Sequence, residues 1–315
     1  MQQTMSANQE TSWPEVRDFV KEKSYLYNGY VMPKVIAPRY LKDIADFKVR
    51  PDDVYLLTYP KSGTTWAQNI ICLILETRGR KADEHLSDKV QYLEFPEGHG
   101  SIPRDVARGM YEVASTKPSP RVLKSHLRVQ FLPTELHTKK PKIVYVARNP
   151  KDSAVSFFNF CSFSYNCPPY RVWSDFFLDF CKGTSPRGSW FDSVLPWWKK
   201  RHEPNVLFLK YEDMQKDLRG SVLKIANFLE YKLSDDQVDN IVAKSTFKAM
   251  KTDPMVNPDS CNPSYQDGVK QNKSFMRKGK VGDWKNYFTV AQNEQFDDLY
   301  ERMTHGTGLV FDYFL

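Results

Sequence analysis

The chain has 315 residues, of which 41% are hydrophobic and 14% aromatic, and its formal net charge is +7. This length and composition predict a folded chain with a sizeable buried core and exclude extensive disorder. The modest positive charge suits a small anionic ligand and lacks the clustered basicity that a nucleic-acid-binding protein carries.

The sequence also bears on location and metal content. The segment from Met1 to Glu15 is polar, and the longest apolar run, Ile70 to Leu75, is far too short to span a bilayer. Five cysteines without a CxxC pair indicate a reducing compartment, and the histidines lack metal-ligand spacing. We therefore expect a cytoplasmic protein that binds no metal, no nucleic acid and no membrane.

Residues 1–30 are expected to form a partly flexible lead-in, and residues 31–315 a single domain. Apolar runs predict parallel strands at 53–58, 121–124, 142–147 and 205–210. Helices are expected at 64–77, 150–160, 171–181, 189–202, 219–229 and 235–244. This alternation predicts an α/β fold with a central parallel sheet flanked by helices. Residues 251–274 are rich in Pro, Asn, Asp and Ser and are expected to form a long loop that acts as a lid.

The first predicted strand runs into Tyr-Pro-Lys-Ser-Gly-Thr-Thr-Trp at 59–66. A loop that enters a helix presents unpaired backbone N–H groups and the positive end of the helix dipole, which together bind an anion. Gly63 permits close backbone approach, Thr64 and Thr65 add hydroxyl groups, and Lys61 adds a charge. The loop resembles a P-loop but is not a Walker A motif, because GxxxxGK[ST] is absent and the lysine precedes the glycine. The alternative is an ordinary turn with a capping threonine.

The strand predicted at 142–147 ends in Arg148, where P-loop nucleotide hydrolases place an aspartate that helps to hold magnesium. A cation at this position indicates a second anionic group instead of a metal. Asn149 and Pro150 suit the start of the following helix. Polar residues recur along that helix at helical spacing, and they form either a binding stripe or a solvated face: Asn149, Asp152, Ser156 and Asn159.

A third basic segment, Arg-Lys-Gly-Lys-Val-Gly-Asp-Trp at 277–284, contains glycines that let a backbone wrap around an anion. With 59–66 and 148–156 it resembles the three cofactor motifs of the cytosolic sulfotransferases, most closely those of the phenol-sulfating branch. The likeness covers residues 30–304 and implies that 31–315 form one sulfotransferase domain. It also implies transfer of a sulfuryl group from 3′-phosphoadenosine 5′-phosphosulfate (PAPS) to a hydroxyl of a small hydrophobic acceptor, with release of 3′-phosphoadenosine 5′-phosphate (PAP).

The resemblance further assigns cofactor contacts to individual residues. Those implied for the 5′-phosphosulfate are Lys61, Ser62, Gly63, Thr64 and Thr65, followed by Trp66 beside the adenine. Those implied for the 3′-phosphate and the closing motif are Arg148, Ser156, Phe275, Met276, Arg277, Lys278 and Gly279. Tyr211, Thr246 and Phe247 match positions near the adenine, although many relatives carry the Ser245–Thr246 pair in reverse order. The segment from Lys285 to Glu294 resembles the family's dimer motif and implies a homodimer.

His126 follows Lys124 at the end of the strand predicted at 121–124, at the sheet edge where α/β proteins bind ligands. The resemblance implies that His126 is the general base, while Lys124 and Lys61 stabilise charge on the sulfuryl group and on the leaving phosphate. The alternative is a structural histidine. Phe95 and Phe160 match acceptor-lining positions, or else belong to the core.

Two other functions stay open at this level. One is a small-molecule or nucleotide kinase that uses the same loop with ATP, which the missing Walker order and Arg148 oppose. The other is a non-catalytic nucleotide-binding protein, which would not need His126 beside Lys124. The sequence names neither the physiological acceptor nor whether amines are sulfated as well as hydroxyl groups.

Overall fold

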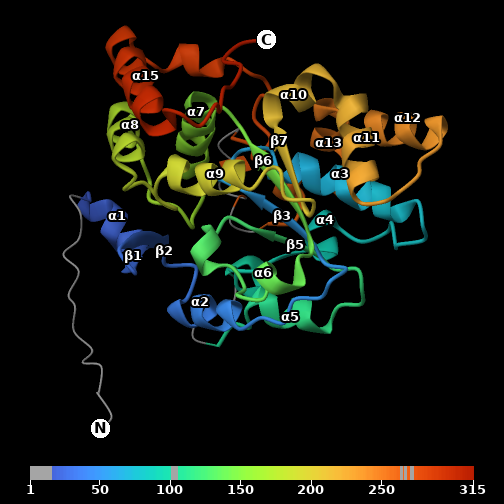
Figure 1. Cartoon of the computed structure of the whole chain (residues 1–315). Coiled ribbons are helices and arrows are strands. Elements are labelled where there is room, and N and C mark those ends of the chain that lie inside the picture. The colour runs from blue at the N-terminus through green and yellow to red at the C-terminus, as the bar shows by residue number, and fades with distance from the viewer. Residues whose placement is uncertain (1–15, 101–105, 263–264, 266–267, 270–272) are drawn as a thin grey trace.

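A five-stranded parallel sheet forms the centre of the molecule (Figure 1). The computed structural model describes residues 16–100, 106–262, 265, 268–269 and 273–315. The strand order is β4-β5-β3-β6-β7, with β4 at Val90–Tyr92, β5 at Val122–Ser125, β3 at Val54–Thr58, β6 at Lys142–Ala147 and β7 at Val206–Lys210. Every neighbouring pair is parallel, and all five residues of β3 are buried. The predicted parallel α/β sheet is therefore confirmed, with β4 as an additional edge strand.

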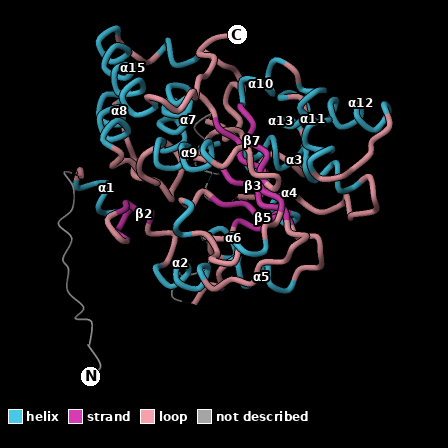
Figure 2. Tube along the Cα trace, in the orientation of Figure 1, coloured by secondary structure: helices cyan, strands magenta, loops and turns pink. Residues whose placement is uncertain are grey.

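Helices cover both faces of the sheet, as Figures 1 and 2 show. One group comprises α3 (Thr64–Glu76), α11 (Leu218–Phe228), α12 (Asp235–Lys244) and α13 (Phe247–Thr252). The other comprises α7 (Pro150–Cys161), α8 (Trp173–Lys182), α9 (Trp190–Lys199) and α15 (Val290–Thr304). Alternate side chains of each strand enter separate cores: Leu56 packs with the first group, whereas Tyr55 and Leu57 pack with the second. Burial on both faces explains why the strands are continuous apolar runs.

The remaining elements surround this framework. They are α1 (Asp18–Lys23), β1 (Ser24–Tyr27), β2 (Tyr30–Pro33), α2 (Pro38–Ala45), α4 (Leu86–Lys89), α5 (Met110–Thr116), α6 (Leu136–Lys139) and α10 (Tyr211–Lys216). β1 and β2 form an antiparallel hairpin, and the expected boundary between residues 30 and 31 falls within it. Residues 1–15 and much of the expected lid, at 263–264, 266–267 and 270–272, lie outside the described residues. Within the described part, no helix is long and apolar enough to cross a bilayer.

A buried ion pair joins the amino ends of β3 and β5. Arg121 Nε donates to Asp53 Oδ1 at 2.7 Å, and Nη2 donates to Oδ2 at 2.6 Å. Both side chains are almost completely buried, so the pair is shielded from water. It lies at the sheet edge opposite the loop that follows β3, and it holds in register the two strands that carry Thr58 and Lys124.

Candidate active site

The loop between β3 and α3 lies at the carboxyl edge of the central strand, as the sequence predicts. Gly63 has φ +101°, and a Cβ atom there would lie 2.8 Å from Cδ2 of Tyr211. A side chain is thus excluded both by conformation and by space. Lys61 also has a positive φ, +65°, which turns the chain before Gly63. The hydroxyl of Thr64 lies 2.7 Å from that of Thr58, so the first helical turn is tied to the strand end.

Basic side chains from distant segments gather beside this loop. Arg148 donates from Nη2 to the carbonyl oxygen of Lys280 at 2.7 Å, and its guanidinium lies over the ring of Tyr211 at 4.5 Å. The pKa of Lys61 falls to about 7, chiefly because the amine is buried and also because Arg148 is near. An anion bound between these cations would relieve their repulsion.

The polar stripe on α7 is not a solvated face. Asp152 is buried and accepts from the backbone N–H groups of Gly282 at 2.8 Å and Trp284 at 3.0 Å. Asn149 is also buried and donates to Asp152 at 2.9 Å. The solvated-face alternative is therefore wrong, since these residues join the segment after Arg148 to the segment at 277–284. Ser156, one turn further along α7, lines a cavity.

His126 stands at the end of β5 with its ring fixed by β3. Its Nδ1 atom lies 2.9 Å from the carbonyl oxygen of Thr58 and 2.9 Å from the Thr58 hydroxyl. A proton on Nδ1 satisfies that carbonyl, which leaves Nε2 as the unprotonated nitrogen. The pKa of His126 lies well below its usual range because the ring is buried and because Arg187, Lys124 and Lys61 are near.

Lys124 lies on the same strand and is held by α3. Its Nζ donates to Oε1 of Gln68 at 3.1 Å, and burial lowers its pKa to about 8. In the parallel register Lys124 is opposite Leu56, two residues before the end of β3. His126 follows the end of β5, so it lies at the same edge of the sheet as the loop after Thr58.

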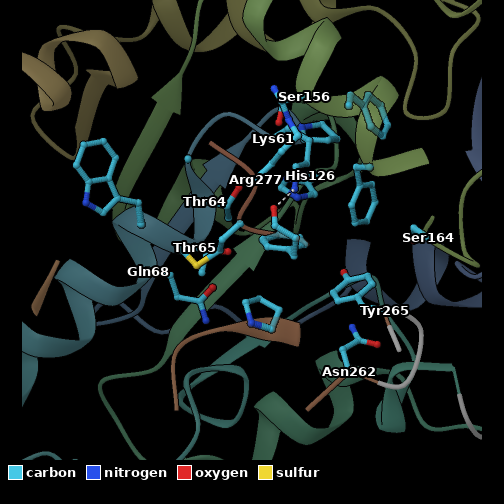
Figure 3. Close-up of a pocket in the computed structure, with 18 of the residues that line it drawn as sticks. Lys61, Thr64, Thr65, Gln68, His126, Ser156, Ser164, Asn262, Tyr265 and Arg277 are labelled. Carbon is cyan, nitrogen blue, oxygen red and sulfur yellow. Dashed lines mark hydrogen bonds between the residues drawn. The ribbon is translucent and has the colours of Figure 1, made fainter. Parts of the chain in front are cut away.

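One cavity of about 260 Å³ unites these groups (Figure 3). It is lined by all the predicted site residues except Ser62 and Thr246: Lys61, Gly63, Thr64, Thr65, Trp66, Phe95, Lys124, His126, Arg148, Ser156, Phe160, Tyr211, Phe247, Phe275, Met276, Arg277, Lys278 and Gly279. Ser62 is fully buried, and Thr246 is an exposed cap whose hydroxyl accepts from the N–H of Ala249. Phe95 and Phe160 are partly buried, so they contact both core and cavity.

Sequence reasoning missed several lining residues. Gln68 and the adjacent Asn69 are buried polar residues that precede the apolar run of α3, which is a usable signal, and Gln68 lines the cavity. Tyr92 lies on the short β4, stacked on Phe95 with ring centres 4.2 Å apart. Arg187 lies in the Ser-Pro-Arg-Gly turn at 185–188, where its φ is +76°. The Pro and Gly of this turn are the second signal in the sequence, because they mark a tight turn that carries a basic residue. Within the described residues, no group of three or more His, Cys, Asp or Glu is arranged to hold a metal ion.

The chain is similar to known proteins over most of its length. Residues 51–308 match the family model for the sulfotransferase domain. Sulfotransferase 1B1 of the dog, Canis lupus familiaris, is 39% identical over 94% of this chain and 97% of its own length. The crystal structure of mouse sulfotransferase SULT7A1 complexed with PAP has a TM-score of 0.73 and 30% identity, covering 90% of this chain and 94% of that one. Retinol dehydratase in complex with androsterone and the inactive cofactor PAP has a TM-score of 0.78 and 29% identity, covering 90% and 89%.

Proposed function

The chain belongs to the sulfotransferase family, and on that basis we propose that it transfers the sulfuryl group of PAPS to a hydroxyl of a small hydrophobic acceptor and releases PAP. Two similar structures contain PAP. The observation that carries the proposal is the convergence of Lys61, Lys124 and His126 on one cavity that Arg148 and Arg277 also line.

The cavity suits a ligand with two anionic ends and a flat base. At one end the loop at 61–65 would bind the 5′-phosphosulfate, with its backbone free of a side chain at Gly63. At the other end Arg148, Ser156, Arg277 and Lys278 would bind the 3′-phosphate.

Aromatic rings lie between the two ends. The Trp66 and Tyr211 ring centres are 5.3 Å apart, and the Trp66 Nε1–H donates to the Ser245 carbonyl at 2.8 Å. A Cβ on Gly279 would collide with the ring of Phe247, so the backbone of the closing segment packs directly on that ring. These side chains offer faces on which an adenine can stack.

The chemistry would follow from the positions of three side chains. Nε2 of His126 accepts the proton of the acceptor hydroxyl, which becomes the nucleophile. Lys124 stabilises charge on the sulfuryl oxygens, and Lys61 stabilises charge on the leaving phosphate. Transfer through a loose, in-line transition state depends mainly on such positioning and electrostatics. The kinase hypothesis has less support, since β6 is followed by Arg148 where a magnesium-holding aspartate is needed.

We also propose a homodimer that uses Lys285–Glu294 and a cytoplasmic location. Val290, at the start of α15 and within this segment, is 77% exposed, and a second copy would cover it. Five free cysteines, three of them buried, fit a reducing compartment.

A turnover assay tests the proposed function. Purified protein is given PAPS with a simple phenol, and separately ATP with the same phenol, each with magnesium or with excess EDTA. We expect aryl sulfate and PAP from the PAPS reactions, at equal rates with and without EDTA. Phosphorylated phenol from ATP, abolished by EDTA, would establish the kinase reading instead.

A further inference from the structure

A buried cluster beside His126, formed by Tyr92, Glu94 and Arg187, is called here the arginine cluster. Arg187 donates from Nη1 to Glu94 Oε1 at 3.0 Å and from Nη2 to the Tyr92 hydroxyl at 3.1 Å. Glu94 is 0% exposed and Arg187 9% exposed. Glu94 Oε1 also accepts from the backbone N–H of His126 at 2.8 Å, so the cluster is attached to the base itself.

The Tyr92 hydroxyl has a defined role in its hydrogen bond with Arg187. A guanidinium can only donate, so the Tyr92 oxygen is the acceptor in its bond with Arg187 and its own hydrogen points elsewhere. Burial raises the pKa of Tyr92 well above its usual value, so the hydroxyl keeps this hydrogen at neutral pH. Tyr92 and Arg187 both line the cavity, whereas Glu94 does not. The cavity is therefore lined by the two residues of the cluster that can donate hydrogen bonds and not by its carboxylate.

The ionisable lysine and arginine side chains of the cavity wall have no acidic counterpart on it in the described part of the chain. They are Lys61, Lys124, Arg148, Arg187, Arg277, Lys278 and Lys280, and among the described residues no aspartate or glutamate lines the cavity. Most of these basic residues belong to the segments assigned to PAPS. Arg187 belongs instead to the turn at 185–188 and lies against the rings of Tyr92 and Phe95, whose centres are 6.0 and 5.5 Å from its guanidinium. Tyr92 in turn contacts the ring of His126, with centres 5.2 Å apart.

We propose that Arg187 and Tyr92 bind an anionic substituent of the acceptor, such as a carboxylate, so that acceptors with a hydroxyl and a separate negative charge are preferred. A guanidinium and a phenolic hydroxyl side by side form charge-assisted hydrogen bonds to a carboxylate. Within the described part of the chain no carboxylate lines the wall, so a protonated amine gains no ion pair there and is disfavoured. This specificity rests on the proposed sulfuryl transfer and names the acceptor class for the same site.

Three phenols test the proposal: 3-(4-hydroxyphenyl)propanoate, its methyl ester, and 4-(2-aminoethyl)phenol. The carboxylate, ester or ammonium group is separated from the ring by two carbons in each case, so the acidity of the phenol is nearly constant across the set. We expect kcat/KM to be about tenfold higher for the carboxylate than for the ester, and lowest for the amine. Equal values, or a preference for the amine, would overturn the proposal.

Variants test whether the arginine cluster causes the preference for the carboxylate over the ester. Tyr92→Phe removes one donor and keeps the Arg187–Glu94 pair, so the carboxylate-to-ester ratio of kcat/KM should fall severalfold. Arg187→Gln alone leaves Glu94 as an unpaired buried charge, so it is made together with Glu94→Gln, and the ratio should then fall to about one. Arg171→Gln, an exposed arginine that does not line the cavity, should keep the wild-type ratio. An unchanged ratio in both cluster variants would contradict the proposal.

Calorimetry separates this proposal from the proposed function. The carboxylate and ester are titrated into wild-type protein and Tyr92→Phe, each saturated with PAP. Tighter binding of the carboxylate in the wild type, by about tenfold and reduced in the variant, supports the site even if no PAPS turnover is seen with any phenol. Equal affinities in the wild type refute the site even if turnover is rapid.

Discussion

The ammonium nitrogen of Lys61 lies 3.5 Å from the centre of the Phe275 ring and 4.7 Å from that of Phe160. Contact with ring faces stabilises the charged form of a lysine only weakly. Burial dominates, and it lowers the pKa of Lys61 to about 7. The lysine assigned to the leaving group is therefore mostly neutral at pH 8 in the ligand-free protein, and an anion beside it would raise its pKa.

PAP binding at pH 8 should accordingly take up about one proton. The pKa of Lys61 is about 7 and that of Lys124 about 8, and a bound anion raises both. Affinity should then decrease as the pH rises above 7. Calorimetry in two buffers with different ionisation enthalpies measures the uptake, and Lys61→Arg, which stays charged, should reduce it. Identical heats in both buffers would contradict this linkage.

His126→Ala should lower kcat about 10²–10⁴-fold while leaving PAP affinity and melting temperature nearly unchanged. The donor contacts at 61–66, 148–156 and 277–279 do not need the imidazole. The loss should be smallest for acidic phenols and largest for aliphatic alcohols, whose protons are hardest to remove. A variant that folds, binds PAP and sulfates an alcohol at the wild-type rate would exclude His126 as the base.

The acid limb of the wild-type pH–rate profile should lie below pH 6.5. Burial first, and then Arg187 and the neighbouring lysines, lower the pKa of His126, and activity is lost as the pH falls through that value. Arg187→Gln removes this cation and leaves the Glu94 carboxylate in place, and both favour the charged imidazole, so the limb should move to higher pH. A wild-type limb above pH 7, or no movement in the variant, would argue against His126 as the titrating group.

Donor binding should require the 3′-phosphate. Adenosine 5′-phosphosulfate lacks the group that Arg148, Ser156 and Arg277 are positioned to bind, and charged hydrogen bonds contribute about 1.5–3 kcal/mol each before solvent screening. We expect at least about a hundredfold weaker binding than for PAPS by calorimetry. Arg148→Met should reduce the difference in affinity between PAPS and adenosine 5′-phosphosulfate. Equal affinity of the wild type for both donors would show that the second anion site is misassigned.

Val290→Glu should convert a homodimer into a monomer, because it places a charge on the exposed valine of the proposed contact. Light scattering at micromolar concentration measures the mass of each form. Met303→Glu, a change of another exposed apolar side chain on α15 outside the segment, should leave the mass unchanged. A wild-type protein that is monomeric at this concentration would refute the dimer.

Arg121→Met should reduce the free energy of unfolding by about 3–5 kcal/mol, since it leaves Asp53 buried and unpaired. Urea denaturation followed by circular dichroism measures the change. Arg219→Met removes an arginine from an exposed pair with Asp235 and should change stability little. A similar small effect for both variants would mean that Asp53 finds water or another partner.

The central strands could be predicted because burial on both faces leaves a continuous apolar run. β6 has the predicted bounds of 142–147, and β7 differs by one residue. The edge strand Val90–Tyr92 has only three residues and pairs only with β5, so it carries no comparable pattern.

The candidate site also contains residues that the sequence could predict and residues that it could not. Residues of the contiguous loops, such as Lys61 and Arg148, are recognisable because each loop contains its own anion-binding chemistry. Glu94 and Arg187 are 93 positions apart, and nothing local indicates that they form a pair. Only the packing of β4 against the turn at 185–188 brings them beside His126.

The bonds from Asp152 to Gly282 and Trp284, 130 and 132 residues further along, also bear on synthesis. A ribosome makes the chain from its amino end, so every strand of the sheet has been synthesised once Lys210 has been added, whereas the partners of Asp152 are added more than seventy residues later. The sheet and the loop at 59–66 can assemble during that interval, while the closing segment is still missing. A nascent chain arrested before residue 277 would thus hold a near-complete framework with an open, uncapped nucleotide cleft. Competence to bind the donor would arise abruptly, in the last steps of translation.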